Sequence, residues 1–460
     1  MSITSRTIFG TDGVRGRANC SPMDPDMALS LGRAIASLFE NGSHKHRIVI
    51  GKDTRLSGYM IETALASGIC SMGADVMLVG PLPTPGIAFI ARSMRADAGV
   101  VISASHNPYD DNGIKFFDKD GFKLPDQLEL RMEEFIKNEM SKAQKPTGDI
   151  IGRAHRIDDA SGRYIQFLKD GFPYRLTLEG MRLVVDCANG AGYKVAPEVF
   201  AELGAEVIEL GTRPDGININ KECGSLNPER MCELVRKVGA NAGIALDGDA
   251  DRVIMCDEKG DVVDGDVIMA LAAKDMMSRG KLKKNTLVAT IMSNLALDRT
   301  MHDLGISVVR TKVGDRYVIS TMRDGGFNLG GEQSGHLIFL DCNTTGDGIM
   351  GGLKILAIML REAKPLSELA RIFEPYPQVR VDVEVLRKCA FDEIPEIARA
   401  IELYKGELGN EGRLIVRYSG TENIARVMVE GERADRIGTM AKDMAGLIRT
   451  HLGNEAREIN

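Results

Sequence analysis

Short apolar runs alternate with amphipathic stretches along the first part of the chain. Runs rich in Val and Ile at 47–51, 75–79 and 98–102 have the length of buried strands. Apolar residues at helical spacing predict a helix over about 58–72 and an earlier one that begins with Ser21-Pro22, with proline in its first turn. Strands that alternate with helices are typical of a parallel α/β sheet.

The same alternation continues to about residue 370. Pro81, Pro83 and Pro85 predict a stiff turn, and the polar stretch 141–153 predicts a domain boundary. The later strands that we expect are 183–186, 205–210, 242–246, 286–291, 307–310 and 337–340, and the later helices are 127–140, 160–168 and 346–361.

The end of the chain has a different order of elements. Alternating residues predict strands at 379–385, 413–417 and 425–430, in a domain of the α+β class rather than a doubly wound one. A chain of 460 residues has room for three or four domains. We expect three similar α/β modules with mixed sheets and a C-terminal α+β domain, with limits at 1–155, 156–258, 259–374 and 375–460.

Composition and charge narrow the class of protein. A net charge of −7 without any run of Lys and Arg argues against a nucleic-acid-binding protein. The eight cysteines have no CxxC spacing, which argues against a zinc cluster, and the first residues lack the apolar core of a signal peptide. We therefore expect free thiols in a cytoplasmic protein. No run of 18 apolar residues predicts a membrane span.

The stretch 98–115 is the strongest candidate for chemistry. An apolar strand leads into Ser103, Ser105 and His106, and Lys115 follows nine residues after the histidine. A hydroxyl beside an imidazole and an ammonium group suits phosphate chemistry, because the hydroxyl can carry a phosphoryl group whose charge the cations offset. The pattern does not choose between the two serines, and an ordinary polar turn after a core strand is the alternative.

Asp247, Asp249 and Asp251 alternate along a loop that follows an expected strand. Alternate residues of an extended loop point the same way, so the three carboxylates would repel one another without a cation among them. Oxygen ligands favour Mg²⁺ or Ca²⁺ over zinc. Arg252 stands where an EF-hand loop needs glycine, which excludes that motif, and it indicates an anionic ligand beside the metal. An acidic surface turn is the alternative.

Three further loops carry residues suited to anions or hydroxyl groups. Arg15 lies in the glycine-rich loop 9–16. The loop 331–336 combines a carboxylate, an amide, a hydroxyl and an imidazole, a mixture that suits a polyhydroxylated ligand. The loop 417–423 offers an arginine, two hydroxyls and a glycine, which is typical of a backbone nest for phosphate. Each of these loops, taken alone, is compatible with a plain turn.

Together these motifs resemble the α-D-phosphohexomutase superfamily over nearly the whole chain. The matching motifs are Phe-Gly-Thr-Asp-Gly-Val-Arg-Gly, Ile-Ser-Ala-Ser-His-Asn-Pro, Asp-Gly-Asp-Ala-Asp-Arg, Gly-Glu-Gln-Ser-Gly-His and Arg-Tyr-Ser-Gly-Thr-Glu. The opening octapeptide and Gln333 resemble the bacterial branch that acts on glucosamine phosphates. Tyr418 and Asn423 depart from the pattern, since many relatives have proline there, but the phosphate-loop residues themselves are kept.

The resemblance implies a role for each site residue. The metal site would consist of a phosphoserine, Ser105, with Asp247, Asp249 and Asp251. Transfer of the phosphoryl group and of protons would involve Arg15, Arg252, His106 and Lys115. The sugar would be bound by Glu332, Ser334, His336 and Lys312. The phosphate that does not react would be bound by Arg417, Ser419, Gly420 and Thr421.

The resemblance also implies a fold and a reaction. Four domains would surround a central cleft, with one Mg²⁺ per chain and a sugar 1,6-bisphosphate as primer and intermediate. The expected reaction is an intramolecular phosphotransfer that interconverts glucosamine 6-phosphate and glucosamine 1-phosphate and feeds amino-sugar nucleotide and cell-wall precursor synthesis. Such a transfer depends mainly on positioning and charge neutralisation.

Two alternatives stay open. A phosphoglucomutase or phosphomannomutase of the same superfamily would share these motifs, and a non-catalytic sugar-phosphate sensor would keep the fold. A P-loop kinase is excluded because GxxxxGK[ST] does not occur in the sequence. The expected partner is a small sugar phosphate, with neither nucleic acid nor membrane, and the chain is expected to be a monomer or a homodimer.

Overall fold

The computed structural model describes residues 6–10, 12–39, 45–409, 411–419 and 423–453, which form two compact units. The first unit consists of Met1–Met292 and Leu304–Ile372, and the second of Ser293–Asp303 and Phe373–Asn460. All eight cysteines are free, as expected. Among the described residues, no helix has the combination of length and apolar character that a bilayer crossing requires.

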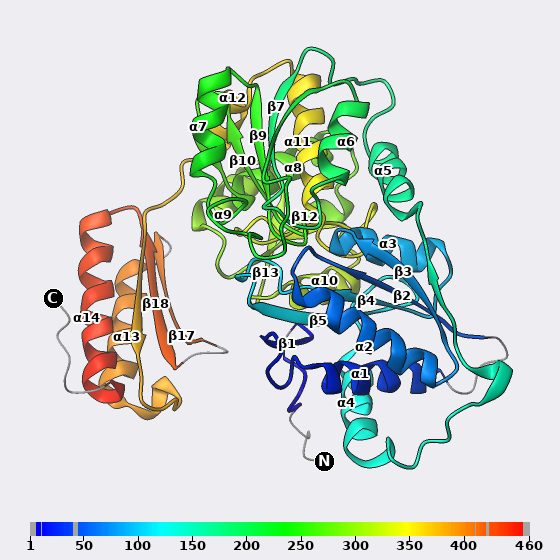
Figure 1. Cartoon of the computed structure of the whole chain (residues 1–460). Coiled ribbons are helices and arrows are strands. Elements are labelled where there is room, and N and C mark those ends of the chain that lie inside the picture. The colour runs from blue at the N-terminus through cyan, green and yellow to red at the C-terminus, as the bar shows by residue number, and fades with distance from the viewer. Residues whose placement is uncertain (1–5, 11, 40–44, 410, 420–422, 454–460) are drawn as a thin grey trace. The chain divides into compact units, whose positions relative to one another are not determined.

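The first unit begins with a six-stranded mixed sheet. Its strands are β1 (Val14–Arg17), β2 (Arg47–Lys52), β3 (Asp75–Pro81), β4 (Ala98–Ile102), β5 (Asp111–Asp118) and β6 (Ala154–Arg156), and its helices are α1 (Pro25–Ser37), α2 (Ser57–Ser71), α3 (Thr84–Ser93) and α4 (Asp126–Glu134). The order is β1-β5-β4-β2-β3-β6, in which β5 runs antiparallel to both of its neighbours (Figure 1). Ile48 and Ile50 pack under α1 and α2, while Gly51 leaves room for Ile87 of α3 on the opposite face.

Two local predictions in this sheet are wrong. The helix expected from Ser21-Pro22 begins at Pro25, because the Asp24 carboxylate accepts a hydrogen bond (2.8 Å) from the N–H of the third helical residue. The proline-rich segment expected as a turn opens α3, and Pro85 lies in its first turn, where a missing N–H breaks no helical hydrogen bond. In addition, β1, β5 and β6 are not among the expected strands. All strands that were expected are present, with limits that differ by at most two residues.

The second sheet carries the acidic loop. Its strands are β7 (Arg182–Asp186), β8 (Glu206–Leu210), β9 (Ala242–Leu246), β10 (Val253–Asp257) and β11 (Val262–Val263), and its helices are α5 (Ala160–Asp170), α6 (Val195–Glu202) and α7 (Glu229–Val238). The order is β11-β10-β9-β7-β8, with β9, β7 and β8 parallel and β10 antiparallel to β9. Residues 247–252 therefore form the tight connection between two adjacent strands, and the flanking β-pairing fixes its position.

The third sheet completes the first unit. Its strands are β12 (Thr286–Thr290), β13 (Ser307–Thr311), β14 (Leu329–Gly331) and β15 (Leu337–Phe339), and the helices are α8 (Gly265–Ser278), α10 (Asp315–Gly325), α11 (Gly348–Glu362) and α12 (Leu366–Leu369). The order is β13-β12-β14-β15. Phe122, which follows β5, packs against the apolar cluster of this sheet beside Val318 and Met322. The first and third sheets are thus joined through an apolar contact.

The second unit is a small α+β fold. Its strands are β16 (Gln378–Glu384), β17 (Gly412–Tyr418) and β18 (Ile424–Gly431), and its helices are α9 (Leu295–Asp303), α13 (Pro395–Leu408) and α14 (Ala434–Leu452). The antiparallel order is β16-β18-β17, and α13 and α14 cover one face of the sheet (Figure 1). Val427 and Val429 pack there against Ile437 and Met444.

The buried Glu430 ties α9 to this second unit. Its side chain accepts hydrogen bonds from the backbone N–H of Leu295 at 2.7 Å and from Nε of Arg413 at 2.6 Å. Asn294 adds a bond from its side-chain amide to the Tyr376 carbonyl at 3.0 Å. The helix α9, which is flanked in sequence by strands of the first unit, is therefore part of the second unit.

Candidate active site

Ser105 lies in the turn between β4 and β5 and faces the acidic loop of the second sheet. Its backbone φ is 53°, a left-handed conformation that a non-glycine residue adopts only when its surroundings hold it there. Its Oγ donates to Asp247 Oδ2 at 2.5 Å and lies 3.2 Å from His106 Nδ1. The Ser103 hydroxyl instead donates to Asp53 Oδ2 at 2.6 Å. Of the two candidate serines, only Ser105 has its hydroxyl on the acidic loop.

Arg55, at the end of the loop after β2, holds the serine turn in place. Its guanidinium is fully buried and pairs with Asp53 through Nε at 2.8 Å. It also donates hydrogen bonds to four backbone carbonyls of the turn, those of Ser105, Asn107, Pro108 and Asp111. The Asn220 side chain donates to the Ser105 carbonyl as well, at 2.9 Å. These bonds compensate for the strained backbone at the serine.

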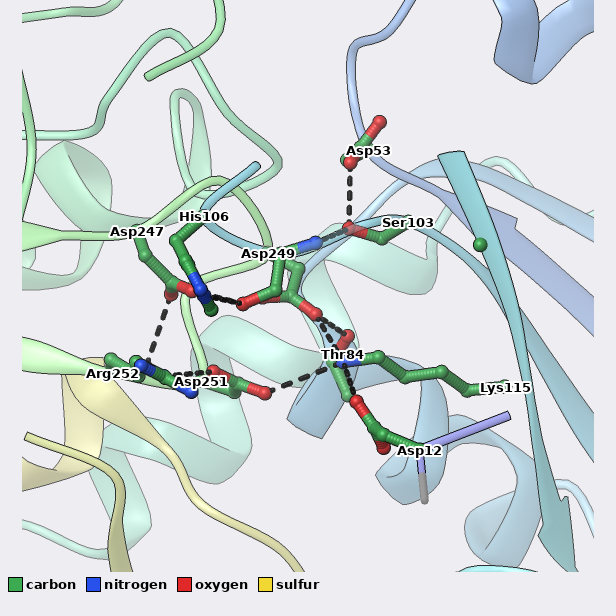
Figure 2. Close-up of polar contacts among 12 residues, drawn as sticks. Asp12, Asp53, Thr84, Ser103, His106, Lys115, Asp247, Asp249, Asp251 and Arg252 are labelled. Carbon is green, nitrogen blue, oxygen red and sulfur yellow. Dashed lines mark hydrogen bonds and ion pairs between the residues drawn. The ribbon is translucent and has the colours of Figure 1, made fainter. Parts of the chain in front are cut away.

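Asp247, Asp249 and Asp251 are buried and bring carboxylate oxygens within 4.8 Å of one another (Figure 2). Burial and the two neighbouring carboxylates raise the pKa of Asp247 well above its usual range. Thr84 Oγ1 donates to Asp249 Oδ2 at 2.7 Å, whereas Asp249 Oδ1 is buried and accepts no hydrogen bond from the part of the chain that the structure describes. A buried carboxylate oxygen without a donor, next to two more carboxylates, fits a hard divalent cation such as Mg²⁺.

Lys115 reaches the same loop from β5. Its Nζ lies 2.8 Å from Asp249 Oδ2, 3.5 Å from Asp251 Oδ2 and 3.4 Å from Asp12 Oδ2, and Figure 2 shows it pointing between these carboxylates. Burial acts to lower the pKa of Lys115, but the three aspartates outweigh it and raise the pKa above its usual range. The ammonium group is therefore charged at neutral pH.

Two arginines add positive charge to the site, Arg15 from the glycine-rich loop and Arg252 from the acidic loop. Gly13 has φ of 80°, and a Cβ there would lie 2.2 Å from the Ile114 carbonyl oxygen, so only glycine lets the loop pack this closely on β5. Arg15 then pairs with Asp12. Arg252 approaches from the acidic loop, with Nε 3.8 Å from the carboxylate of the preceding residue. Two guanidinium groups thus lie within the same charged cluster.

The two candidate histidines differ in charge. Burial, with the nearby arginines, lowers the pKa of His106 to about 4, so its imidazole is neutral near pH 7. Burial acts the same way on His336, but Asp251 and Asp315 outweigh it and raise the pKa of His336 to about 9. His336 Nδ1 lies 3.5 Å from Asp251 Oδ1, and its Nε2 lies 3.7 Å from Asp315 Oδ2. The His106 imidazole is therefore available as a base, whereas the His336 imidazole is a cation near pH 7.

The loop expected to bind sugar lies against the acidic loop. Arg252 and His336 form an isolated antiparallel bridge, which places the two loops side by side. Ser334 Oγ donates to Glu332 Oε2 at 3.4 Å. Lys312 directly follows β13 in the same unit. The structure thus brings the acidic loop together with Glu332, Ser334 and His336.

In the second unit, Arg417 and Ser419 lie at the end of β17. Arg417 is paired in register with Arg426 on β18. Burial, followed by Arg426 and Arg380, lowers the pKa of Arg417. Like charges in register across a sheet are destabilising. Asp382, whose Oδ2 lies 3.6 Å from Arg426 Nε, offsets part of that repulsion, and a bound anion would offset more of it. Gly420-Thr421, the rest of the expected phosphate loop, lies outside the described residues.

Several residues that complete the first-unit site were not predicted. Asp12 could have been found, because its glycine-rich loop was recognised. Arg55, Thr84, Asn220 and Lys123 could not, because their partners lie on other sheets or far along the chain. No local spacing marks such residues.

Four family models match the chain in succession. They describe phosphoglucomutase/phosphomannomutase alpha/beta/alpha domain I at residues 6–143, domain II at 162–260, domain III at 264–376 and the C-terminal domain at 379–447.

Individual proteins match over almost their full length. A phosphoglucosamine mutase of Anaeromyxobacter dehalogenans is 61% identical over 457 residues, covering 98% of this chain and 100% of the relative. A phosphoglucomutase/phosphomannomutase family protein of Burkholderia thailandensis has a TM-score of 0.79 at 24% identity, covering 97% of this chain and 99% of that one. The N-acetylphosphoglucosamine mutase of Aspergillus fumigatus, solved with GlcNAc-6P and magnesium, has a TM-score of 0.66 at 19% identity, covering 97% and 96%.

Proposed function

Since the chain belongs to the phosphoglucomutase/phosphomannomutase family, we propose that it interconverts glucosamine 6-phosphate and glucosamine 1-phosphate through a 1,6-bisphosphate. The observation that carries the proposal is the Ser105 hydroxyl, held 2.5 Å from Asp247 inside a buried cluster of carboxylates and cations. The choice of the amino sugar rests on the name of the 61% identical relative.

Each half-reaction would transfer one phosphoryl group between Ser105 and a sugar hydroxyl. The bond from Ser105 Oγ to phosphorus breaks while a bond from the sugar oxygen to phosphorus forms, and the sugar hydroxyl gives up its proton. The neutral imidazole of His106 is suited to accept that proton, and the charged Lys115 is suited to neutralise the phosphoryl oxygens. In the second half-reaction the phosphoryl group on the other sugar oxygen would return to Ser105. The bond from that sugar oxygen to phosphorus breaks while a bond from Ser105 Oγ to phosphorus forms, the sugar oxygen regains a proton, and the phosphoserine is regenerated.

Mg²⁺ would be held by the three aspartates and by Ser105. When bound, it would supply Lewis-acid stabilisation of charge on the transferring group. The proposed roles of the remaining residues are transferring-phosphate binding by Arg15 and Arg252, sugar binding by Glu332, Ser334, His336 and Lys312, and distal-phosphate binding by Arg417, Ser419, Gly420 and Thr421.

The proposal includes the organisation and setting of the protein. Four domains with limits at 1–155, 156–258, 259–374 and 375–460 would contribute one loop each. The partner would be a sugar phosphate, the chain would act in the cytoplasm as a monomer or homodimer, and neither nucleic acid nor membrane would take part.

Ser105→Ala tests the proposal, with Ser103→Ala as the matched control. Intact-mass measurement should find the phosphoryl group on wild type and on the control and not on Ser105→Ala, and only the two phosphorylated proteins should turn over glucosamine 6-phosphate. Full turnover by Ser105→Ala would refute the mechanism. A kcat/KM higher on glucose or mannose phosphate than on glucosamine 6-phosphate would favour the related mutases, and binding without turnover by the phosphorylated protein would favour a sensor.

A further inference from the structure

Lys123 lies between the charged cluster and the third sheet. It follows β5 in a short hairpin closed by a bridge between Phe117 and Lys123. Its Nζ contacts Asp12 Oδ1 and lies 2.5 Å from Asp315 Oδ2, and its side chain is only 17% exposed. One ammonium group thus joins an aspartate of the glycine-rich loop to an aspartate at the start of α10.

In its contact with the glycine-rich loop, Lys123 determines which oxygen of the Asp12 carboxylate faces the other cations. Oδ1 contacts Lys123, whereas Oδ2 faces Arg15 and lies 3.4 Å from Lys115 Nζ. The carboxylate is therefore shared, and only one of its oxygens is directed at the reacting cations. Lys115 remains closest to Asp249, at 2.8 Å.

Asp315, the other partner of Lys123, is the first residue of α10, directly next to the sugar loop. Its Oδ2, which contacts Lys123, lies 3.7 Å from His336 Nε2. The backbone N–H of Gly314 donates to Glu332 Oε1 at 3.0 Å. Lys123 thus contacts the start of α10, which in turn contacts Glu332 and His336, two of the residues proposed to bind the sugar.

An open space adjoins these charged side chains on one side. A cavity of about 660 Å³ is lined by Asp12, Lys115 and Lys123 together with residues of α10. The cavity leaves part of their surroundings unfilled, and the ion pairs with Asp12, Asp249 and Asp315 direct the two ammonium groups on the remaining side. Loss of one cation would therefore let the others rearrange.

We propose that Lys123 is a positioning residue that holds the phosphoryl-transfer cations and the sugar loop in one arrangement. Without it, both oxygens of Asp12 would turn to Lys115 and Arg15 and draw the Lys115 ammonium away from Asp249. Asp315 would lose its nearest cation at the same time, so its Oδ2, now 3.7 Å from His336 Nε2, would turn to that imidazole and draw it away from Asp251. The inference rests on the proposed function, because the arrangement matters only if phosphoryl transfer occurs there.

The test compares Lys123→Met, Lys123→Arg and a control, Lys283→Met, in the full chain. Lys283 also pairs with an aspartate, Asp341, at 2.7 Å, on the third sheet and outside the cluster. Each phosphorylated protein is assayed for kcat and KM on glucosamine 6-phosphate, and for its thermal unfolding midpoint. We expect Lys123→Met to lose about 10- to 100-fold in kcat with a smaller change in KM, since small displacements of catalytic groups cost this much. Lys123→Arg should recover most of the loss, and the control should match wild type.

The outcomes separate the inference from the proposed function. A kcat of Lys123→Met within twofold of wild type would overturn the inference, and so would parallel losses of kcat and unfolding midpoint that Lys123→Arg does not restore. If Lys123→Met does not fold, Asp315→Asn takes its place, with the same expected loss of kcat and the same refutation. A wild-type protein that turns over no hexose phosphate would refute the proposed function and, with it, this inference.

Discussion

Replacing Arg55 by methionine should disorganise the serine turn from within the core. Methionine fills part of the same volume without any hydrogen-bond donor. The change removes a fully buried guanidinium from four backbone carbonyls and from Asp53. The Asp53 carboxylate stays buried and keeps two hydrogen-bond donors, the Ser103 hydroxyl and the backbone N–H of residue 55.

The expected loss follows from these contacts. A hydrogen bond to a charged group contributes about 1.5–3 kcal/mol, and removal of one partner of a buried ion pair costs about 3–5 kcal/mol. These effects share one side chain and are not additive, so we expect Arg55→Met to lose about 4 kcal/mol in the free energy of unfolding. Turnover should fall by more than about 100-fold, because Ser105 would leave the acidic loop.

The loss should also depend on pH. Burial raises the pKa of Asp53 even though Arg55 opposes this, and removal of the arginine raises it further. A carboxyl group whose pKa is higher in the native state than in the unfolded state binds more protons in the native state. Its effect on stability is therefore least unfavourable below the unfolded-state pKa and worsens as pH rises through the native-state pKa. The deficit of Arg55→Met should shrink toward pH 4.

Urea unfolding followed by circular dichroism measures the loss, and the Arg55→Met/Asp53→Asn double variant is its control. Because the double variant has no unpaired buried charge, it should regain at least about 1 kcal/mol over Arg55→Met. A loss below about 1 kcal/mol in Arg55→Met, or turnover near that of wild type, would refute the view that this arginine holds the turn.

Three further outcomes are expected. Burial acts to raise the pKa of Glu133, but backbone N–H groups of residues 7–9 outweigh it and lower the pKa to about 2. Glu133→Gln should therefore lose about 2 kcal/mol in the free energy of unfolding, measured with urea at pH 7. This difference from wild type should vanish as the pH falls from about 4.5 toward 2. Arg417→Gln should raise KM for glucosamine 6-phosphate more than it lowers kcat, and a larger effect on kcat would contradict a role in holding the distal phosphate. Chelation with EDTA should abolish turnover and Mg²⁺ should restore it, with Asp249→Asn needing more Mg²⁺ for half-maximal rate; activity that survives chelation would contradict a metal requirement.

The sequence predicted those parts of the site that depend on local spacing. The three aspartates fall on one tight connection between adjacent strands, so their spacing alone brings them together. The choice between Ser103 and Ser105 could not be made in this way, because it depends on the left-handed backbone at Ser105, which long-range hydrogen bonds from Arg55 maintain.

The difference between local and long-range interactions also explains which elements of the fold were predicted wrongly. Most strands with buried apolar runs were predicted, because the pattern lies in their own residues. β10 was not predicted, although all five of its residues are buried. β5 begins with Asp111, Asn112 and Gly113, which locally favour a turn, and it forms a strand because it pairs with β4 on one side and β1 on the other. The proline-rich start of α3 was misjudged because prolines are as compatible with a first helical turn as with a loop.

The attachment of α9 to the second unit has a consequence for movement. The chain crosses between the units after residues 292, 303 and 372. Two units joined by a single covalent connection can rotate about it. Three connections restrict that rotation, because each of them must accommodate it. We therefore expect any movement of one unit to require bending of the backbone at all three crossings.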